Sequence, residues 1–148
     1  MLETGLKNRL YSLLERSGSK AIVQFESFFP GERFAGGKYH IGTHTITLYL
    51  EEIKGQCLQL FSSLDFFNEY IEIVFAHEIG HAEDKNLLWL ADQLDIAETE
   101  TERLGIALQI EENAWNFAES VIGSDSELFQ VIKTHSLQPY RDQLLVGA

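Results

Sequence analysis

The sequence predicts an α+β fold in which a small antiparallel or mixed sheet comes first and a helical half follows. Two observations carry this prediction. Segments with the two-residue alternation of strands are confined to residues 20–50, and beyond about Ser62 the apolar residues recur at helical spacing. The 148 residues contain no internal repeat or linker-like segment, so we expect a single domain over residues 1–148.

The N-terminal elements are a helix and three strands. The first helix has leucines at helical spacing and ends near Gly18. Residues 20–26 predict a strand, and the Pro30-Gly31 pair marks a turn. Residues 38–50 predict a hairpin, with strands at 38–41 and 45–50 around a turn at 42–44. In its second strand apolar and more polar residues alternate, so we expect one buried face and one solvated face.

Four helices are expected after the hairpin. Residues 66–85 and 87–94 predict the first two. Thr99 and Glu102 have the spacing of a capping box that begins a third, long helix, which Gly123 ends. Ser124 and Glu127 repeat this spacing before a last helix that runs towards residue 135.

Charge and composition exclude several classes of partner. The 23 acidic and 11 basic residues give a formal charge of -12, which repels phosphate backbones and anionic lipid headgroups. We therefore expect no direct nucleic-acid binding. No segment has the apolar length of a membrane span, and the N-terminal helix lacks the apolar core of a signal peptide. The single Cys57 fits a reducing compartment, so we expect a cytoplasmic protein.

The motif HEIGH in the 66–85 helix has the spacing of a metal site. His77 and His81 are about 40° apart on a helix and one turn apart along its axis, so both imidazoles can reach one ion. Glu78 projects about 60° to the side, where it suits a general base better than a ligand. The same face carries Tyr70 and Val74, which indicates that it is buried. The alternative is that both histidines are ordinary core residues satisfied by hydrogen bonds.

A third ligand is expected from the 100–122 helix, because catalytic zinc usually keeps three protein ligands. In a helical projection Glu111 lies in the middle of the apolar stripe, whereas Glu112 lies on the polar face with Gln109 and Glu119. A buried carboxylate needs a compensating charge, and a metal on the two histidines supplies one. Glu111 is therefore the predicted third ligand, with Glu112 as the alternative.

These two segments, FAHEIGHA and EENAWNFAES, resemble the ImmA/IrrE family of zinc metallopeptidases, which are small intracellular proteins with a gluzincin-type site. The second motif of that family typically reads E-x-x-A-N-x-F-A, and four positions match it here: Glu111, Ala114, Phe117 and Ala118. Trp115 departs from the pattern, because the family usually has Asn there. The resemblance covers the chain from Thr45 to Ile122.

The resemblance implies a zincin-like fold and a Zn²⁺ ion held by His77, His81 and Glu111, with Glu78 as the catalytic base. In zincins an edge strand aligns an extended substrate through backbone hydrogen bonds, a role that would fall to residues 43–50.

The function implied is hydrolysis of a peptide bond in a polypeptide substrate such as a regulatory protein. The alternative is a non-catalytic or latent zinc-binding interaction module with the same fold. An oxyanion donor is also expected, and His135, Tyr140 and Arg141 are the candidates. Asp84 lies on the face of the two histidines, where it can orient one of them or face solvent.

Overall fold

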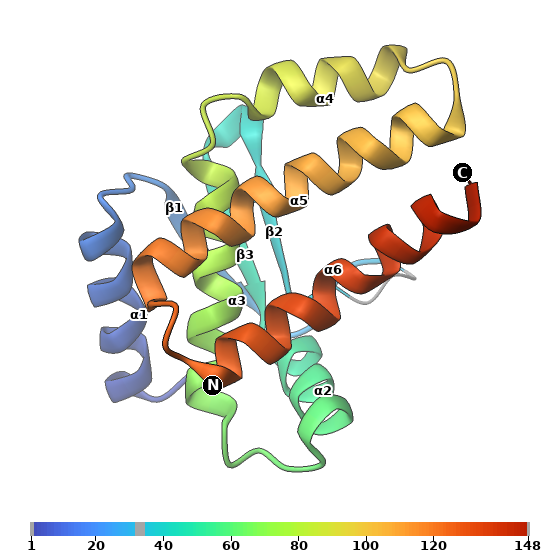
Figure 1. Ribbon diagram of the computed structural model, residues 1–148. Coiled ribbons are helices and arrows are strands. Elements are labelled where there is room, and N and C mark those ends of the chain that lie inside the picture. Colours follow the sequence, from blue (N-terminus) through green and yellow to red (C-terminus); the bar gives the residue numbers. More distant parts are fainter. Residues whose placement is uncertain (1, 32–34, 148) are drawn as a thin grey trace.

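The computed structural model describes residues 2–31 and 35–147 and has an α+β architecture (Figure 1). The sheet comes early in the chain and the helices follow it, as predicted. The elements are α1 (Thr4–Ser17), β1 (Ile22–Glu26), β2 (Gly37–His40), a short 3₁₀ turn (Ile41–Thr43), β3 (Thr45–Tyr49), α2 (Leu50–Phe61), α3 (Phe67–Ala82), α4 (Leu87–Ile96), α5 (Glu100–Ile122) and α6 (Glu127–Gly147).

The sheet is mixed and has the strand order β1-β3-β2. β2 pairs antiparallel with β3, which confirms the hairpin, and β1 pairs parallel with β3. The prediction that one face of the second hairpin strand is solvated is wrong, because side chains on both faces of β3 are buried. Thr45 and Tyr49, predicted on that face, are both buried, and the Phe29 ring packs edge-on against Tyr49 with centroids 5.2 Å apart.

Helix α2 was not predicted, since after the hairpin helices were expected only beyond Ser62. It begins at Leu50, directly after the central strand. Ile53 and Cys57 lie one turn apart on its inner face and are fully buried. Leu50, Leu60 and Phe61 also pack against the core, so apolar residues recur at helical spacing at positions 50, 53, 57, 60 and 61, and this signal was missed.

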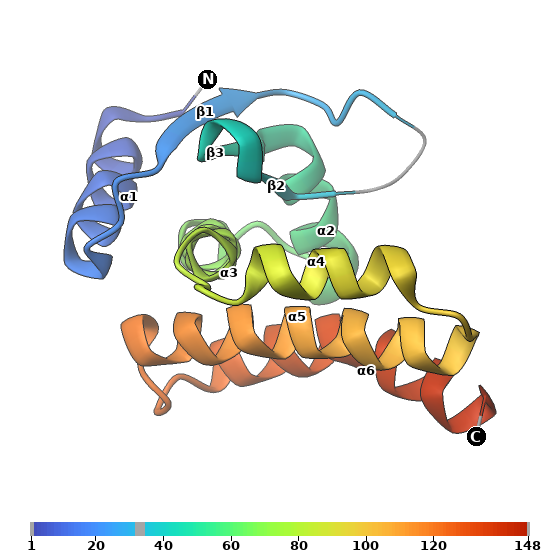
Figure 2. The same ribbon diagram turned by 90° about the horizontal axis from the view of Figure 1, so that it is seen from above.

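Helix α3 lies at the centre of the molecule. Figure 2 shows the sheet on one side of α3 and the pair α5 and α6 on the other, with α1 along a third side. A helix that is apolar around most of its circumference is expected in such a position, and nine of its residues are buried. Gly80 permits a very close approach to α5, because a Cβ atom there would lie 2.3 Å from the Ala114 carbonyl oxygen.

The caps of the last two helices agree in part with the sequence. The Thr99 hydroxyl accepts a hydrogen bond from the Glu102 backbone N–H at 3.1 Å, and Gly123 follows the end of α5, as predicted. At α6, however, Ser126 accepts from the Phe129 N–H at 3.1 Å, so the predicted cap at Ser124 is wrong.

The last helix also extends beyond its predicted end and through Pro139 to Gly147. Phe129, Ile132 and Leu137 anchor α6 in the core, and their burial offsets the cost of the proline, about 3 kcal/mol. Within the described part of the chain, none of the helices combines the length and apolarity needed to cross a bilayer.

Candidate metal centre and its cleft

Helices α3 and α5 bring His77, His81 and Glu111 into direct contact. The two imidazole rings lie one turn apart on α3, with centroids 4.7 Å apart. The Nε2 atom of His77 is 2.9 Å from Glu111 Oε1, and that of His81 is 3.3 Å from Glu111 Oε2. Three residues predicted from spacing and helical projection therefore meet at one point, although 34 positions separate His77 from Glu111.

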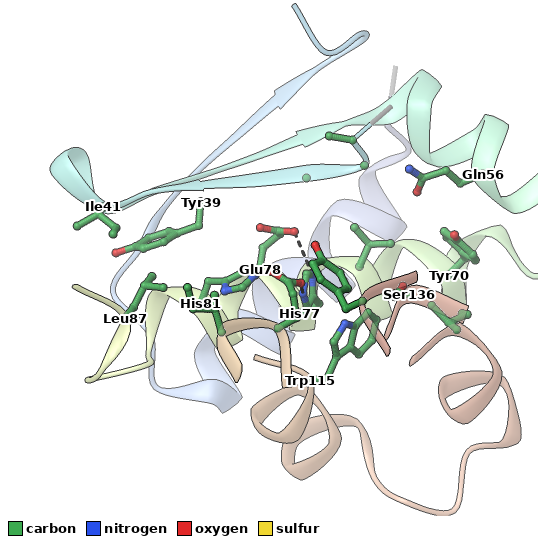
Figure 3. Close-up of a pocket in the computed structure, with 18 residues that line it drawn as sticks. Tyr39, Ile41, Gln56, Tyr70, His77, Glu78, His81, Leu87, Trp115 and Ser136 are labelled. Atoms are coloured by element: carbon green, nitrogen blue, oxygen red, sulfur yellow. Dashed lines mark hydrogen bonds and ion pairs between the residues drawn. The ribbon is translucent and has the colours of Figure 1, made fainter. Parts of the chain in front are cut away.

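Glu78 occupies the other side of the same histidine. Its Oε2 atom lies 3.1 Å from Nδ1 of His77, and the residue is 5% exposed. The edge strand β2 lies directly against it, since a Cβ atom on Gly37 would be 2.7 Å from Glu78 Cγ. Glu78 is thus held between α3 and β2, beside the two imidazoles and facing the cleft (Figure 3).

The electrostatics of this cluster favour a cation. Burial alone would lower the pKa of the His77 imidazole, but hydrogen bonds to Glu111 and Glu78 outweigh it and raise that pKa to about 10. Burial alone would raise the pKa of the Glu111 carboxyl, yet hydrogen bonds from His77 and His81 hold it well below its usual value. Two carboxylates around one point stabilise positive charge, whether a proton or a metal supplies it.

The donor set fits a metal ion. His77, Glu78 and His81 each offer a ligand atom, and these atoms lie within 4.8 Å of one another, so the group can hold an ion. Glu78 approaches Nδ1 of His77, whereas Glu111 approaches Nε2 of His77 with one oxygen and Nε2 of His81 with the other. Glu111 is thus in contact with both histidines, although the group with ligand atoms within 4.8 Å of one another contains Glu78 and not Glu111.

Trp115 forms the wall behind His77. Its ring stacks on the imidazole with centroids 4.5 Å apart and planes at 22°, and Phe129 packs edge-on against it. The indole N–H of Trp115 is buried and has no hydrogen-bond partner among the described residues. Trp115, at which the second motif departs from the ImmA/IrrE pattern, therefore holds the candidate ligand His77 in place.

The other acidic candidates point elsewhere. The Glu112 side chain is partly exposed and lies 3.4 Å from Arg141, so the structure places it away from the histidines, as the projection indicated. The two Asp84 oxygens accept hydrogen bonds from the Asn86 backbone and the Asn113 side chain, at 2.9 and 3.2 Å. Asp84 thus joins the turn before α4 to α5 rather than orienting a histidine.

A cleft of about 470 Å³ opens over the cluster, between β2, α3, α4, α5 and α6. Of the three candidates for an oxyanion donor, Tyr140 lines this cleft, together with Ser136. His135 lines a smaller adjoining cavity, and Arg141 contacts Glu112. Tyr140 is thus the one of the three candidates that lines the cleft over the histidines.

The edge of the sheet at this cleft is β2 and not β3. Residues 43–50 were expected to form the edge strand that aligns the substrate. This expectation is wrong, because β3 is paired on both sides. Gly36, Gly37 and Tyr39 form the upper wall of the cleft, and none of the three was predicted as part of the site. The paired glycines before a short strand were the available signal, since glycine in a strand often marks a close approach of another group.

Comparison of the chain with protein-family models, with curated proteins and with solved structures gives no match. The resemblance of the two motifs to the ImmA/IrrE family therefore stays a prediction, carried by the residues themselves.

Proposed function

We propose that this protein is a zinc-dependent metallopeptidase of the ImmA/IrrE type with a zincin-like fold, and that it hydrolyses a peptide bond in a polypeptide. One observation carries the proposal: Glu111, from a separate helix, contacts Nε2 of both histidines, while Glu78 is buried beside them at the cleft. Glu111 gives the site a charged third donor, and Glu78 gives it a base that a structural zinc site would not need.

His77, His81 and Glu111 would hold Zn²⁺. When bound, the ion supplies a Lewis acid that polarises the scissile carbonyl and lowers the pKa of a water molecule. Glu78 accepts a proton from this water as its oxygen attacks the carbonyl carbon. Glu78 then transfers the proton to the leaving amine nitrogen as the C–N bond breaks, and the second proton of the water also passes to the amine, so the products are a carboxylate and an ammonium ion.

The chain also offers groups that position the substrate. β2 is the edge strand over Glu78, and its free side can pair with an extended peptide through backbone hydrogen bonds. Tyr140 lines the cleft and can donate to the oxygen on which negative charge develops. These roles would place the scissile bond between β2 and α3.

Metal content beside activity tests the proposal. Glu78→Gln should keep one zinc per chain, measured by elemental analysis, and lose hydrolysis of a peptide library. His77→Ala and Glu111→Ala should lose the metal, whereas Glu112→Ala should retain it as a matched control on the adjacent position. Wild-type protein without zinc, or Glu111→Ala that binds it normally, would show that the site assignment is wrong.

The second candidate is a non-catalytic or latent zinc-binding module. The direct contacts of His77 with Glu78 and Glu111 favour this candidate, because the two carboxylates already have a partner of opposite charge when no substrate is bound. Full zinc occupancy combined with no cleavage across the library would support this module over the enzyme.

A further inference from the structure

The cleft around the candidate metal centre has an unusual composition for this chain. Charged residues make up 23% of the sequence. Apart from Glu78 and Glu111, none of the described residues that line the cleft or the adjoining cavity is Asp, Glu, Lys or Arg. An ionised substrate side chain placed away from Glu78, Glu111 and the two histidines would lose water and find no partner of opposite charge among the described lining residues, which is costly.

The two ends of the cleft differ in chemistry. Figure 3 shows Tyr39, Ile41 and Leu87 at one end, beyond His81, and Gln56, Tyr70 and Ser136 at the other. The first end is formed by the short turn after β2 and by the start of α4, and it offers mainly apolar surface.

The second end carries polar groups that make no hydrogen bond to any other described residue: the Gln56 carboxamide, the Tyr70 hydroxyl and the Ser136 hydroxyl. Burial raises the pKa of Tyr70 to about 12, so its hydroxyl remains a neutral donor at physiological pH. The adjoining cavity, of about 280 Å³, continues this end with Gln59 and His135. An apolar ligand group would leave these donors and acceptors unpaired, whereas an amide or hydroxyl would pair them.

The direction of β2 assigns an order to the two ends. The strand begins at Gly37 and leads into Ile41, so its N-terminal end lies near Gln56 and its C-terminal end near Leu87. Antiparallel pairing is the more stable arrangement per residue at a sheet edge. A peptide bound in that direction places its N-terminal side beside Ile41 and its C-terminal side beside Gln56.

We propose that the cleft selects peptides that are uncharged on both sides of the scissile bond, with an apolar side chain on the N-terminal side and a Ser, Thr, Asn or Gln side chain on the C-terminal side. This inference rests on the proposed peptidase function and specifies the substrate class of the same site.

Peptide binding to zinc-loaded Glu78→Gln protein tests the inference without requiring turnover. Four fluorescein-labelled peptides of equal length are compared: one with Leu then Gln at the two central positions, one with Gln then Leu, one with Asp in place of Gln, and one with Lys in place of Leu. The first should bind about tenfold more tightly than each of the others, because an unpaired charge or a mismatched polar group is then buried.

Charge-introducing variants in the same background locate the two ends. Gln56→Lys should reverse the preference so that the Asp peptide binds more tightly than the Gln peptide. Ile41→Lys should weaken binding of the Leu–Gln peptide, and Ile41 is 42% exposed, so this change should leave the fold intact. Gln93→Lys on α4 lies outside the cleft and serves as the matched control, with unchanged binding.

Equal binding of all four peptides, or no peptide binding by protein that holds full zinc, would overturn this specificity while leaving the zinc site in place. An unchanged preference in Gln56→Lys would do the same. Absence of zinc from the wild-type protein would instead refute the proposed function, so the two failures are distinguishable.

Discussion

The contact between α3 and α5 predicts a large effect of Gly80→Ala. The new Cβ atom would lie 2.3 Å from the Ala114 carbonyl oxygen and 2.8 Å from its Cα atom. Carbon atoms in favourable contact are about 3.5–4.0 Å from their neighbours, so the two helices must separate by about 1 Å. Both opposing atoms belong to the backbone, and no side-chain rotation can relieve the clash.

Two measurable quantities should change. Overpacking of this kind costs about 1–3 kcal/mol, and the gain in helix propensity from Gly to Ala, about 1 kcal/mol, offsets it in part. For a chain of this size each kcal/mol lowers Tm by about 2–4 °C. Ala114 is three residues from Glu111, and metal–ligand distances tolerate only about 0.2 Å, so zinc affinity should fall by about tenfold or more.

The assay compares Gly80→Ala with Gly105→Ala. Gly105 lies within α5, and a Cβ atom there has no neighbour within 4 Å, so its replacement should stabilise the protein by about 0.5–1 kcal/mol. Urea unfolding of both variants in the presence of a chelator gives the stabilities, and competition with a fluorescent chelator gives the zinc affinities. If Gly80→Ala is as stable as the wild type and binds zinc equally well, the close contact between α3 and α5 does not position Glu111, and the reasoning is refuted.

Three other outcomes are expected. Gly37→Ala should abolish peptide hydrolysis while retaining zinc, because the added Cβ displaces Glu78 and not a ligand; activity near that of the wild type would contradict this position of β2. Trp115→Phe should change the free energy of unfolding by less than about 1 kcal/mol, since removal of an unpaired buried N–H offsets the lost packing; calorimetry that shows a loss of 3 kcal/mol would mean that the N–H is satisfied. Zinc added to metal-free protein at pH 8 should release at least one proton, because His77 is protonated below its pKa of about 10 and must lose this proton to bind the ion. Titration calorimetry in buffers of different ionisation heat measures the number of protons released. Zero release would count against His77 as a ligand.

Local patterns in the sequence were sufficient for much of the site. The four-residue spacing of His77 and His81 requires only a helix to bring their rings together, and the apolar stripe around Glu111 turns that carboxylate inward on its own helix. The cap at Thr99 is likewise local, because its donor is three residues away. These features hold in the structure since each depends on a few neighbouring residues. The ligand and catalytic roles given to these side chains stay predictions until the metal and the activity are measured.

Other features could not be read from local pattern. β3 has the alternation of a half-exposed strand, yet side chains on both of its faces are buried, because segments distant in the chain, among them Phe29 and α3, pack against it. The cap of α6 falls on Ser126, although Ser124 has the spacing of a capping box.

The sequence by itself thus indicated which side chains come together: two histidines, a glutamate beside them and a second glutamate facing inward from another helix. Only the tertiary structure decided which strand forms the edge above Glu78, and with it the two chemically different ends of the cleft. Helical periodicity is set within a single turn, whereas the order of strands in a sheet depends on pairing between segments far apart in the chain.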